Sequence, residues 1–154
     1  MEVTETQIPW LDETHPNFIR WKRARDISFE RGKFVKSILT KIIDCKNLSI
    51  LDLGSGEGGT SDILSENNNI VSFDLSKERL KRRSEQESNA LRLCGNASDL
   101  PFNKNSFDVI IIQDVLEHLD EKKDFPEMIY KLLKEKDYTV IMDRCIKVEH
   151  AMTK

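Results

Sequence analysis

A glycine-rich turn directly after an apolar run restricts the fold of this chain more than any other feature. Residues 48–53 are largely apolar and lead into Gly54-Ser55-Gly56-Glu57-Gly58-Gly59, with four glycines in six residues. A tight turn that needs positive φ explains one or two such glycines, but not this density after a strand. A strand, a glycine loop and a helix in succession place backbone N–H groups and a positive helix end beside a ligand. The segment therefore predicts a ligand-binding turn in an α/β fold.

Short apolar runs alternate with helical stretches along most of the chain. We expect strands at 48–53, 70–74, 90–94, 108–113 and 138–143, and helices at 59–67, 77–87 and 124–134. Short strands separated by helices are typical of right-handed βαβ units and a parallel sheet. Residues 109–112 are continuously apolar, as in a strand that is covered on both faces.

The first 46 residues differ from the rest in pattern. Residues 1–16 are polar and contain Pro9 and Pro16, so we expect a mobile lead-in. From about 17 to 44, apolar side chains recur at three to four residues, which predicts an amphipathic helix or a broken pair with Gly32 as the weak point. We therefore divide the chain into a lead-in and helical cap over 1–46 and a ligand-binding core over 47–154.

Length and charge exclude several classes of protein. With 154 residues and a formal charge of 24 − 27 = −3, the chain is expected to form one soluble domain. The balanced charge argues against a nucleic-acid partner, because such partners need an extended basic surface. No apolar run approaches membrane-spanning length, and the acidic N-terminus lacks the apolar core of a secretory signal. We expect neither a membrane partner nor export.

Cysteine and histidine usage indicates a reduced compartment without a metal site. Cys45, Cys94 and Cys145 are odd in number and form no C-x-x-C pair, as in cytoplasmic proteins with reduced thiols. The three histidines form no ligand pattern with them, so we expect a cytoplasmic protein with no metal.

The glycine loop alone is compatible with a dinucleotide site. Gly54, Gly56 and Gly59 satisfy G-x-G-x-x-G, and Asp74, 20 residues after Gly54, stands where a ribose-binding acid belongs. An NAD-dependent oxidoreductase is therefore one alternative, although it leaves the later motifs of the chain unexplained.

The same loop also reads as D-x-G-x-G-x-G, beginning at Asp52, and in this form it resembles motif I of the class I S-adenosylmethionine-dependent methyltransferases. Further along, residues 95–102, 106–109 and 114–119 resemble the type 11 methyltransferase pattern of G-D-A-x-x-L-P-F, S-F-D and V-L-E-H-L, in the same order and at similar spacing. The resemblance covers about residues 47–143. It is specific to the family and not to any one substrate.

The resemblance implies a Rossmann-like three-layer α/β sandwich with five parallel strands ordered 3-2-1-4-5 and an N-terminal helical cap. Only eleven residues follow position 143, so we expect the family's usual last two strands to be missing. An exposed fifth strand invites pairing with another chain, which makes a homodimer through that edge a prediction.

The implied function is transfer of a methyl group from S-adenosylmethionine to a small or medium-sized acceptor. A non-catalytic or truncated S-adenosylmethionine-binding module is the alternative. It is favoured by the short end of the chain and by Asn96, which replaces the acid of G-D-A. The sequence does not identify the acceptor or its reacting atom.

A cofactor site at the strand ends follows from the resemblance. Asp74 would accept the ribose hydroxyls, the alternative being a cap for the helix near Ser76. Asn96 would accept the adenine amino group in place of the family's acid. Leu75 and Leu100 would sandwich the ring or pack in the core. The predicted cofactor residues are Asp52, Gly54, Ser55, Gly56, Asp74, Leu75, Asn96, Ala97 and Gln113.

Two further candidates concern catalysis and closure of the site. His118 is a candidate catalytic base, because imidazole titrates near neutral pH and methyl transfer to a hydroxyl or amine releases a proton. V-L-E-H-L is shared by members with different substrates, however, which favours a structural or cofactor-side role for His118. In the lead helix, Trp21 or Arg25 could approach the cofactor's carboxylate. The alternative is a helix that covers the sheet and exposes its cations to water.

Overall fold

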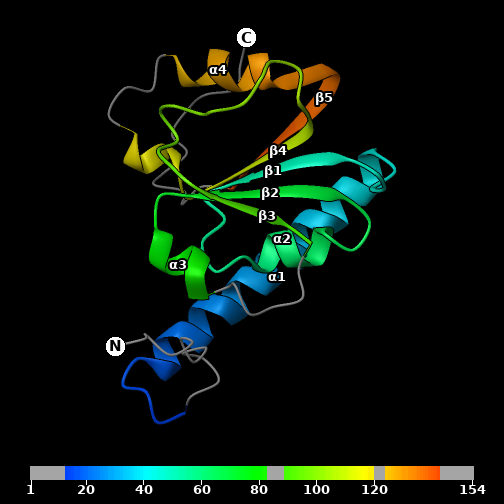
Figure 1. The fold of residues 1–154 in the computed structure, drawn as a ribbon. Coiled ribbons are helices and arrows are strands. Elements are labelled where there is room, and N and C mark those ends of the chain that lie inside the picture. The colour runs from blue at the N-terminus through cyan, green and yellow to red at the C-terminus, as the bar shows by residue number, and fades with distance from the viewer. Residues whose placement is uncertain (1–12, 83–88, 120–123, 143–154) are drawn as a thin grey trace, which may run out of the picture.

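The computed structural model describes residues 13–82, 89–119 and 124–142. They form a five-stranded parallel sheet in the order β3-β2-β1-β4-β5. Helices α1 and α2 lie on one face of this sheet and α4 lies on the other (Figure 1). The predicted Rossmann-like sandwich and its strand order are confirmed.

The strands are β1 (Ser49–Leu53), β2 (Asn69–Asp74), β3 (Leu91–Cys94), β4 (Phe107–Gln113) and β5 (Leu133–Met142). The helices are α1 (Phe18–Ile42), α2 (Gly59–Leu64), α3 (Lys77–Arg82) and α4 (Phe125–Leu132), with a short 3-10 helix η1 (Leu116–His118). All five predicted strands are present, but the last one begins earlier than predicted. Leu133 is already extended and pairs with Phe107, so α4 ends at Leu132 and not at Lys134. Asp143, the predicted end of β5, lies outside the described residues.

The lead helix α1 is continuous through Gly32. Of the two predicted alternatives, the structure has the single amphipathic helix and not the broken pair, so Gly32 is not a weak point. Gly32 is buried, and a Cβ at this position would lie 2.8 Å from the Cα of Thr60 and 3.0 Å from the carbonyl oxygen of Gly59. The absence of a side chain therefore lets α1 pack closely on α2. Close helix packing compensates for the low helix propensity of glycine.

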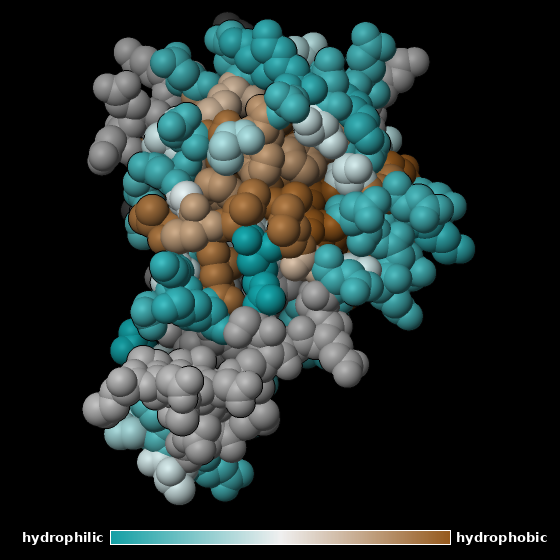
Figure 2. All heavy atoms as spheres, in the orientation of Figure 1, coloured by the Kyte–Doolittle hydropathy of each residue, from teal (hydrophilic) through white to brown (hydrophobic). Residues whose placement is uncertain are grey.

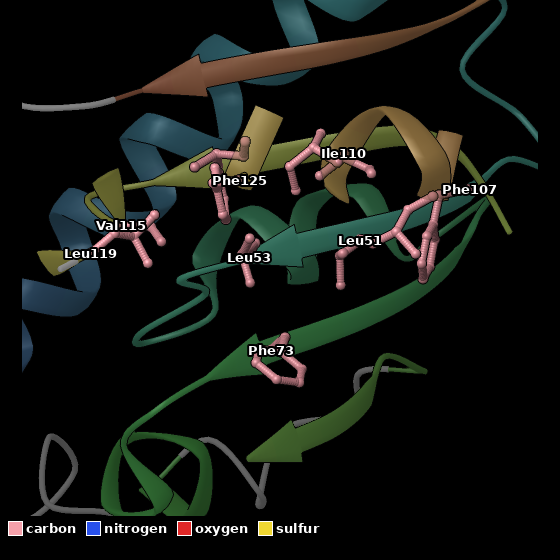
Figure 3. Packing of buried hydrophobic residues seen from close by; sticks show 11 residues of the cluster. Leu51, Leu53, Phe73, Phe107, Ile110, Val115, Leu119 and Phe125 are labelled. Carbon is pink, nitrogen blue, oxygen red and sulfur yellow. The ribbon is translucent and has the colours of Figure 1, made fainter. Parts of the chain in front are cut away.

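Two apolar clusters hold the layers together. Between the sheet and α4, Leu51 and Ile110 pack with Phe125 and the other side chains shown in Figure 3. On the opposite face, Val35 of α1 packs with Ile50 and neighbouring strand residues. Adjacent residues of one strand point to opposite faces, so an apolar strand contributes to both clusters. Helix α1 therefore contributes side chains to the core of the sheet.

The face of the molecule shown in Figure 2 has an exposed apolar region. In the orientation of Figure 1, brown apolar side chains are exposed across the middle of the molecule and are framed by hydrophilic ones (Figure 2). Across the described ranges, we find no helix with the length and apolar character needed to cross a bilayer.

Candidate functional site

A cavity of about 610 Å³ opens at the carboxyl ends of β1, β2, β3 and β4. This is the edge at which open parallel sheets bind ligands, and pockets for small ligands occupy about 300–1,000 Å³. Its wall combines the glycine loop, the segments that follow β2, β3 and β4, and part of α1. The predicted residues that line it are Gly54, Ser55, Gly56, Asp74, Leu75, Asn96, Ala97, Gln113 and His118.

The glycine loop has a backbone conformation that favours glycine. Gly54, Gly56 and Gly58 have φ values of +77°, +51° and +78°. A Cβ on Gly54 would lie 2.2 Å from the carbonyl oxygen of Gln113, so a larger residue could not follow β1 here. The end of β1 thus lies directly against the end of β4, and the loop forms the floor between them.

Asp74 connects this loop to the turn after β2. Its Oδ2 accepts a hydrogen bond from the N–H of Gly56 at 2.8 Å, and its Oδ1 accepts one from the N–H of Ser76 at 2.8 Å. The side chain is largely buried and lines the cavity. The turn-stabilising alternative for Asp74 is therefore present in the structure. A carboxylate has about four acceptor positions, so these two bonds leave capacity for donors of a ligand.

Asp52 lies beneath the loop and outside the cavity wall. It is fully buried, where its Oδ1 accepts from Nε2 of Gln113 at 2.7 Å and its Oδ2 accepts from the hydroxyl of Ser61. The Ser72 hydroxyl donates to the Ser61 hydroxyl, and the Thr60 hydroxyl donates to Oε1 of Gln113. This buried network joins β1, α2, β2 and β4. Asp52 supports the loop from below, and Gln113 connects the network to the cavity.

The segment after β3 supplies the side of the cavity predicted for adenine. Leu75 is 73% exposed and lines the cavity with Asn96 and Ala97. The Oδ1 of Asn96 accepts a hydrogen bond from the N–H of Ser98 at 2.9 Å, so one acceptor position of this oxygen is used within the turn. Leu100 packs against the cluster below α4 and does not line the cavity, which is the core alternative given for it.

Neither Trp21 nor Arg25 lines the cavity. The ring of Trp21 lies 4.4 Å from that of His15, and Arg25 donates to the carbonyl oxygen of Glu57 at 3.2 Å. Arg31, one to two turns further along α1, reaches the cavity instead. Its Nη1 lies 2.6 Å from Oδ2 of Asp114, which directly follows β4. The helical periodicity of the sequence predicts which face of α1 is buried. It does not predict which turn of α1 lies next to the carboxyl ends of the strands.

Arg79 is a second cation that sequence reasoning missed. Its Nε donates to Oε1 of the buried Glu57 at 3.2 Å. Its guanidinium lies over Gly56, where Nη2 would be 2.8 Å from a Cβ. The glycine loop and α3 are therefore joined across Gly56 by this ion pair, close to Asp74.

His118 stands on η1 at the edge of the cavity. Its side chain is 75% exposed, and its Nε2 lies 3.4 Å from Oε1 of Glu117. Among residues 13–82, 89–119 and 124–142, no three His, Cys, Asp or Glu side chains lie close enough together to hold a metal ion.

A family model described as a methyltransferase domain matches residues 51–141. This range contains the glycine loop, Asp74 and His118. The chain belongs to the class I S-adenosylmethionine-dependent methyltransferases. The match also decides between the two families suggested by the glycine loop.

Curated relatives of this methyltransferase domain are longer than the chain itself. An uncharacterised protein of Methanocaldococcus jannaschii is 31% identical over 143 residues, which cover 92% of this chain and 60% of that protein. Demethylmenaquinone methyltransferase of Lactococcus lactis is 34% identical over 134 residues, covering 80% of this chain and 52% of that enzyme. The chain thus spans little more than half the length of these two relatives.

Solved structures show the same fold. A putative sarcosine dimethylglycine methyltransferase from Galdieria sulphuraria superposes with a TM-score of 0.69 at 24% identity, over 77% of this chain and 48% of that one. The helix-and-sheet arrangement of the methyltransferase domain is thereby confirmed beyond its own sequence motifs.

Proposed function

We propose that this chain binds S-adenosylmethionine and transfers its methyl group to a small or medium-sized acceptor. The observation that carries the proposal is the position of Asp74, whose carboxylate lines the cavity while it holds the N–H of Gly56 in the glycine loop. A carboxylate at the end of β2 is suited to accept two ribose hydroxyls. The family of the chain supports this cofactor.

The lining of the cavity also supports this proposal for the remaining parts of the cofactor. Leu75, Asn96 and Ala97 would hold the adenine ring, and the glycine loop would lie against the ribose and the amino-acid tail. Within the described structure, the buried hydroxyl of Ser55 has no hydrogen-bond partner, and this residue lines the cavity. A ligand atom at the loop would satisfy this hydroxyl, since buried polar groups are rarely left unpaired.

The side chains around the cavity would act mainly by positioning and by excluding water. When bound, S-adenosylmethionine supplies a methyl group on a positively charged sulfur that is already an activated leaving group. Ile27 of α1 and Val115 and Leu119 after β4 give part of the wall an apolar surface. Such a surface holds an acceptor in line with the methyl group and keeps water out.

We assign proton removal from the acceptor to His118, with a structural role as the alternative. Its exposed ring at the cavity edge can accept a proton and release it to water. His118→Gln keeps a polar side chain but cannot be protonated near neutral pH. A catalytic role predicts a lower kcat with unchanged affinity for S-adenosylhomocysteine, whereas a structural role predicts a lower melting temperature.

The experiment that tests the proposed function has a binding step and a transfer step. Calorimetry with S-adenosylhomocysteine, S-adenosylmethionine and NAD should show micromolar binding of the first two and none of NAD. Binding of NAD alone would support the oxidoreductase alternative. Transfer of radiolabelled methyl groups is then measured on a panel of amines and quinols, because the named relatives include a demethylmenaquinone enzyme and a putative sarcosine enzyme. Cofactor binding without transfer across this panel would support the non-catalytic module.

We also propose that two copies of the chain pair through β5. In the described part of the sheet, β5 pairs with β4 alone, and Tyr138 and Ile141 on this strand are 37% and 56% exposed. An edge strand with exposed apolar side chains is suited to pairing with another strand. Sedimentation should show a dimer that Ile141→Lys weakens. A wild-type monomer at high concentration would overturn this proposal.

A further inference from the structure

Helix α1 carries a large share of the positive charge of the chain. It contains eight of the 24 Lys and Arg residues but only two of the 27 Asp and Glu residues, so its formal charge is 8 − 2 = +6. The rest of the chain has 24 − 8 = 16 cations and 27 − 2 = 25 acids, a formal charge of −9. The balanced total of −3 therefore hides a strong separation of charge. In Figure 1, α1 lies on the outside of the molecule, and its first half extends beyond the sheet.

Ion pairs compensate only part of the charge on α1. Five of its eight cations pair with carboxylates of α1 itself, of α2, or of the segments after α2 and β4, and these are Lys22, Arg25, Arg31, Lys33 and Lys36. The other three, Arg20, Arg23 and Lys41, are exposed and form no ion pair with any carboxylate among residues 13–82, 89–119 and 124–142. An anionic partner that contacts α1 would meet these three charges uncompensated.

The three uncompensated cations lie on the same side of α1 as its exposed apolar side chains. Ile27 and Phe34, between Arg23 and Lys41 in sequence, are 47% and 57% exposed. The intervals along this side are three, four or seven residues, which bring side chains onto one side of an α-helix. No acidic residue occurs at these positions. We call this side the α1 stripe, and its members are Arg20, Arg23, Ile27, Phe34, Ile38 and Lys41.

The chemistry of the α1 stripe favours one kind of partner. A second copy that packed its own stripe on this one would bring cations close to cations, which repel each other. A membrane with anionic lipids offers phosphate groups to the cations and an acyl-chain boundary to the apolar side chains. Both halves of the stripe therefore find a matching surface on such a membrane.

We propose that the α1 stripe docks the protein on the surface of a membrane that contains anionic lipids. Arg20, Arg23 and Lys41 would lie at the lipid phosphates. Ile27 and Phe34 would lie at the boundary between head groups and acyl chains. The acidic remainder of the chain is repelled by the same surface, so the separation of charge also orients the molecule with α1 toward the membrane.

This docking is compatible with the absence of a spanning helix in the described residues. The expectation of no membrane partner rests on that absence and on the balanced total charge, whereas a helix that lies on a surface needs only exposed cations and apolar side chains. Ile27 belongs to the stripe and also lines the cavity, so the cavity of the docked protein would lie next to the lipid. Docking goes beyond the proposed function and is measured without cofactor or acceptor.

Flotation with lipid vesicles tests the proposal. The probe is a vesicle in which one third of the phosphatidylcholine is replaced by phosphatidylglycerol, and pure phosphatidylcholine vesicles are the neutral comparison. We expect wild type to bind the anionic vesicles at least tenfold more tightly than the neutral ones at about 0.1 M salt. This binding should be lost at about 1 M salt, because the screening length falls from about 10 Å to about 3 Å.

A set of charge variants tests whether α1 makes the contact. The combined variant Arg20→Gln, Arg23→Gln and Lys41→Gln should bind the anionic vesicles at least tenfold more weakly, since each cation near such a surface contributes about fivefold in affinity. The matched control is the combined variant Lys77→Gln, Lys104→Gln and Lys131→Gln. It removes three exposed cations from other elements and changes the total charge equally, and its affinity should fall less than threefold.

Phe34→Gln separates docking from the attraction of charge alone. It keeps every cation and removes the largest apolar side chain of the α1 stripe, so the affinity for anionic vesicles should fall at least threefold. All substituted side chains are exposed, so the melting temperatures should stay close to that of wild type.

Four results would overturn the proposal. The first is a wild-type chain that does not bind anionic vesicles, and the second is an equal loss of affinity in the two charge variants. The third is unchanged vesicle affinity in Phe34→Gln. The fourth is binding of a single-stranded RNA oligonucleotide without binding of vesicles, which would assign the α1 stripe to nucleic acid. Failure to bind S-adenosylhomocysteine would refute the proposed function but would leave these vesicle results unaffected.

Discussion

Gly32 of α1 lies so close to Thr60 of α2 that a Cβ on Gly32 would be 2.8 Å from the Thr60 Cα. In an exposed helix, replacing glycine by alanine stabilises by about 1 kcal/mol. At this position the added methyl group must push two backbones apart, so we expect Gly32→Ala to lower the free energy of unfolding by about 1–3 kcal/mol. Urea unfolding measures the change. Lys33→Ala, on the exposed side of α1, should stay within about 0.5 kcal/mol. A stabilised Gly32→Ala would contradict the close packing.

The buried hydrogen-bond network below the glycine loop predicts that replacing Gln113 lowers the stability of the fold. Its Nε2 donates to the fully buried carboxylate of Asp52 at 2.7 Å. Gln113→Leu removes this donor and leaves a fully buried carboxyl group with one fewer hydrogen bond, which should lower the free energy of unfolding by about 1–3 kcal/mol. Ser72→Ala removes a hydroxyl from the same network without touching Asp52 and should cost less, about 1 kcal/mol. Equal losses for the two variants in thermal unfolding would argue against the Gln113–Asp52 bond as the main support.

Loss of the Asp74 carboxylate should weaken the binding of S-adenosylhomocysteine. We expect Asp74→Ala to cost one to a few kcal/mol of binding free energy, on the order of a pair of charge-assisted hydrogen bonds. The melting temperature must be measured alongside, because Asp74 also holds the N–H groups of Gly56 and Ser76. Asp99→Asn is the control, since Asp99 is exposed and does not line the cavity. Unchanged affinity in Asp74→Ala would remove Asp74 from the ribose site.

Asp108 should make the stability depend on pH in the acidic range. Burial raises the pKa of its carboxyl, but hydrogen bonds from Lys134 and from the N–H of Ser49 outweigh burial and hold the pKa below its ordinary value. Because the pKa of Asp108 is lower in the folded state, ionised Asp108 stabilises the fold at pH values above its unfolded pKa of about 3.9. This stabilisation is lost as the pH falls through the pKa of the folded state.

The test for Asp108 compares wild type with Asp108→Asn in urea between pH 6 and pH 3. The difference in free energy of unfolding should be largest at pH 6 and should shrink as the pH falls below about 4. Glu127→Gln is the comparison variant. The Glu127 pKa is lowered by a hydrogen bond from Lys131 on an exposed helix surface, where ion pairs contribute little. If the difference in free energy of unfolding between wild type and Asp108→Asn stayed constant over this pH range, the lowered pKa of Asp108 would be contradicted.

The order of the strands could be predicted because each strand has its own apolar run and the family motifs lie at strand ends. The sequence left open whether the lead helix breaks at Gly32, and this glycine shows why local reasoning could not decide. Low helix propensity is a local property of glycine, whereas the close approach of Thr60 belongs to the tertiary structure. The predicted start of β5 was wrong for a similar reason. Leu133 pairs with Phe107 and thereby ends α4, although the composition of this segment also suits a helix.

Most of the candidate site could be read from the residues that follow the strands, since parallel strands bring their carboxyl ends to one edge. Asp52 was assigned to the cofactor because its motif adjoins the loop, but within a strand the side chain points to one face or the other. The roles of Arg31 and Arg79 depend on partners 83 and 22 residues away. No local pattern encodes such pairs.

The hydrogen bonds around the glycine loop have a consequence for how tightly a ligand is bound. Asp74 holds the loop from the side and the network around Asp52 holds it from below, through β1, α2, β2 and β4. Little conformational entropy is therefore lost when a ligand arrives, and more of the contact energy is kept as affinity. In hydrogen exchange, the amide of Gly56 should already exchange slowly in the empty protein, as expected of a receptor that is rigid before it is filled.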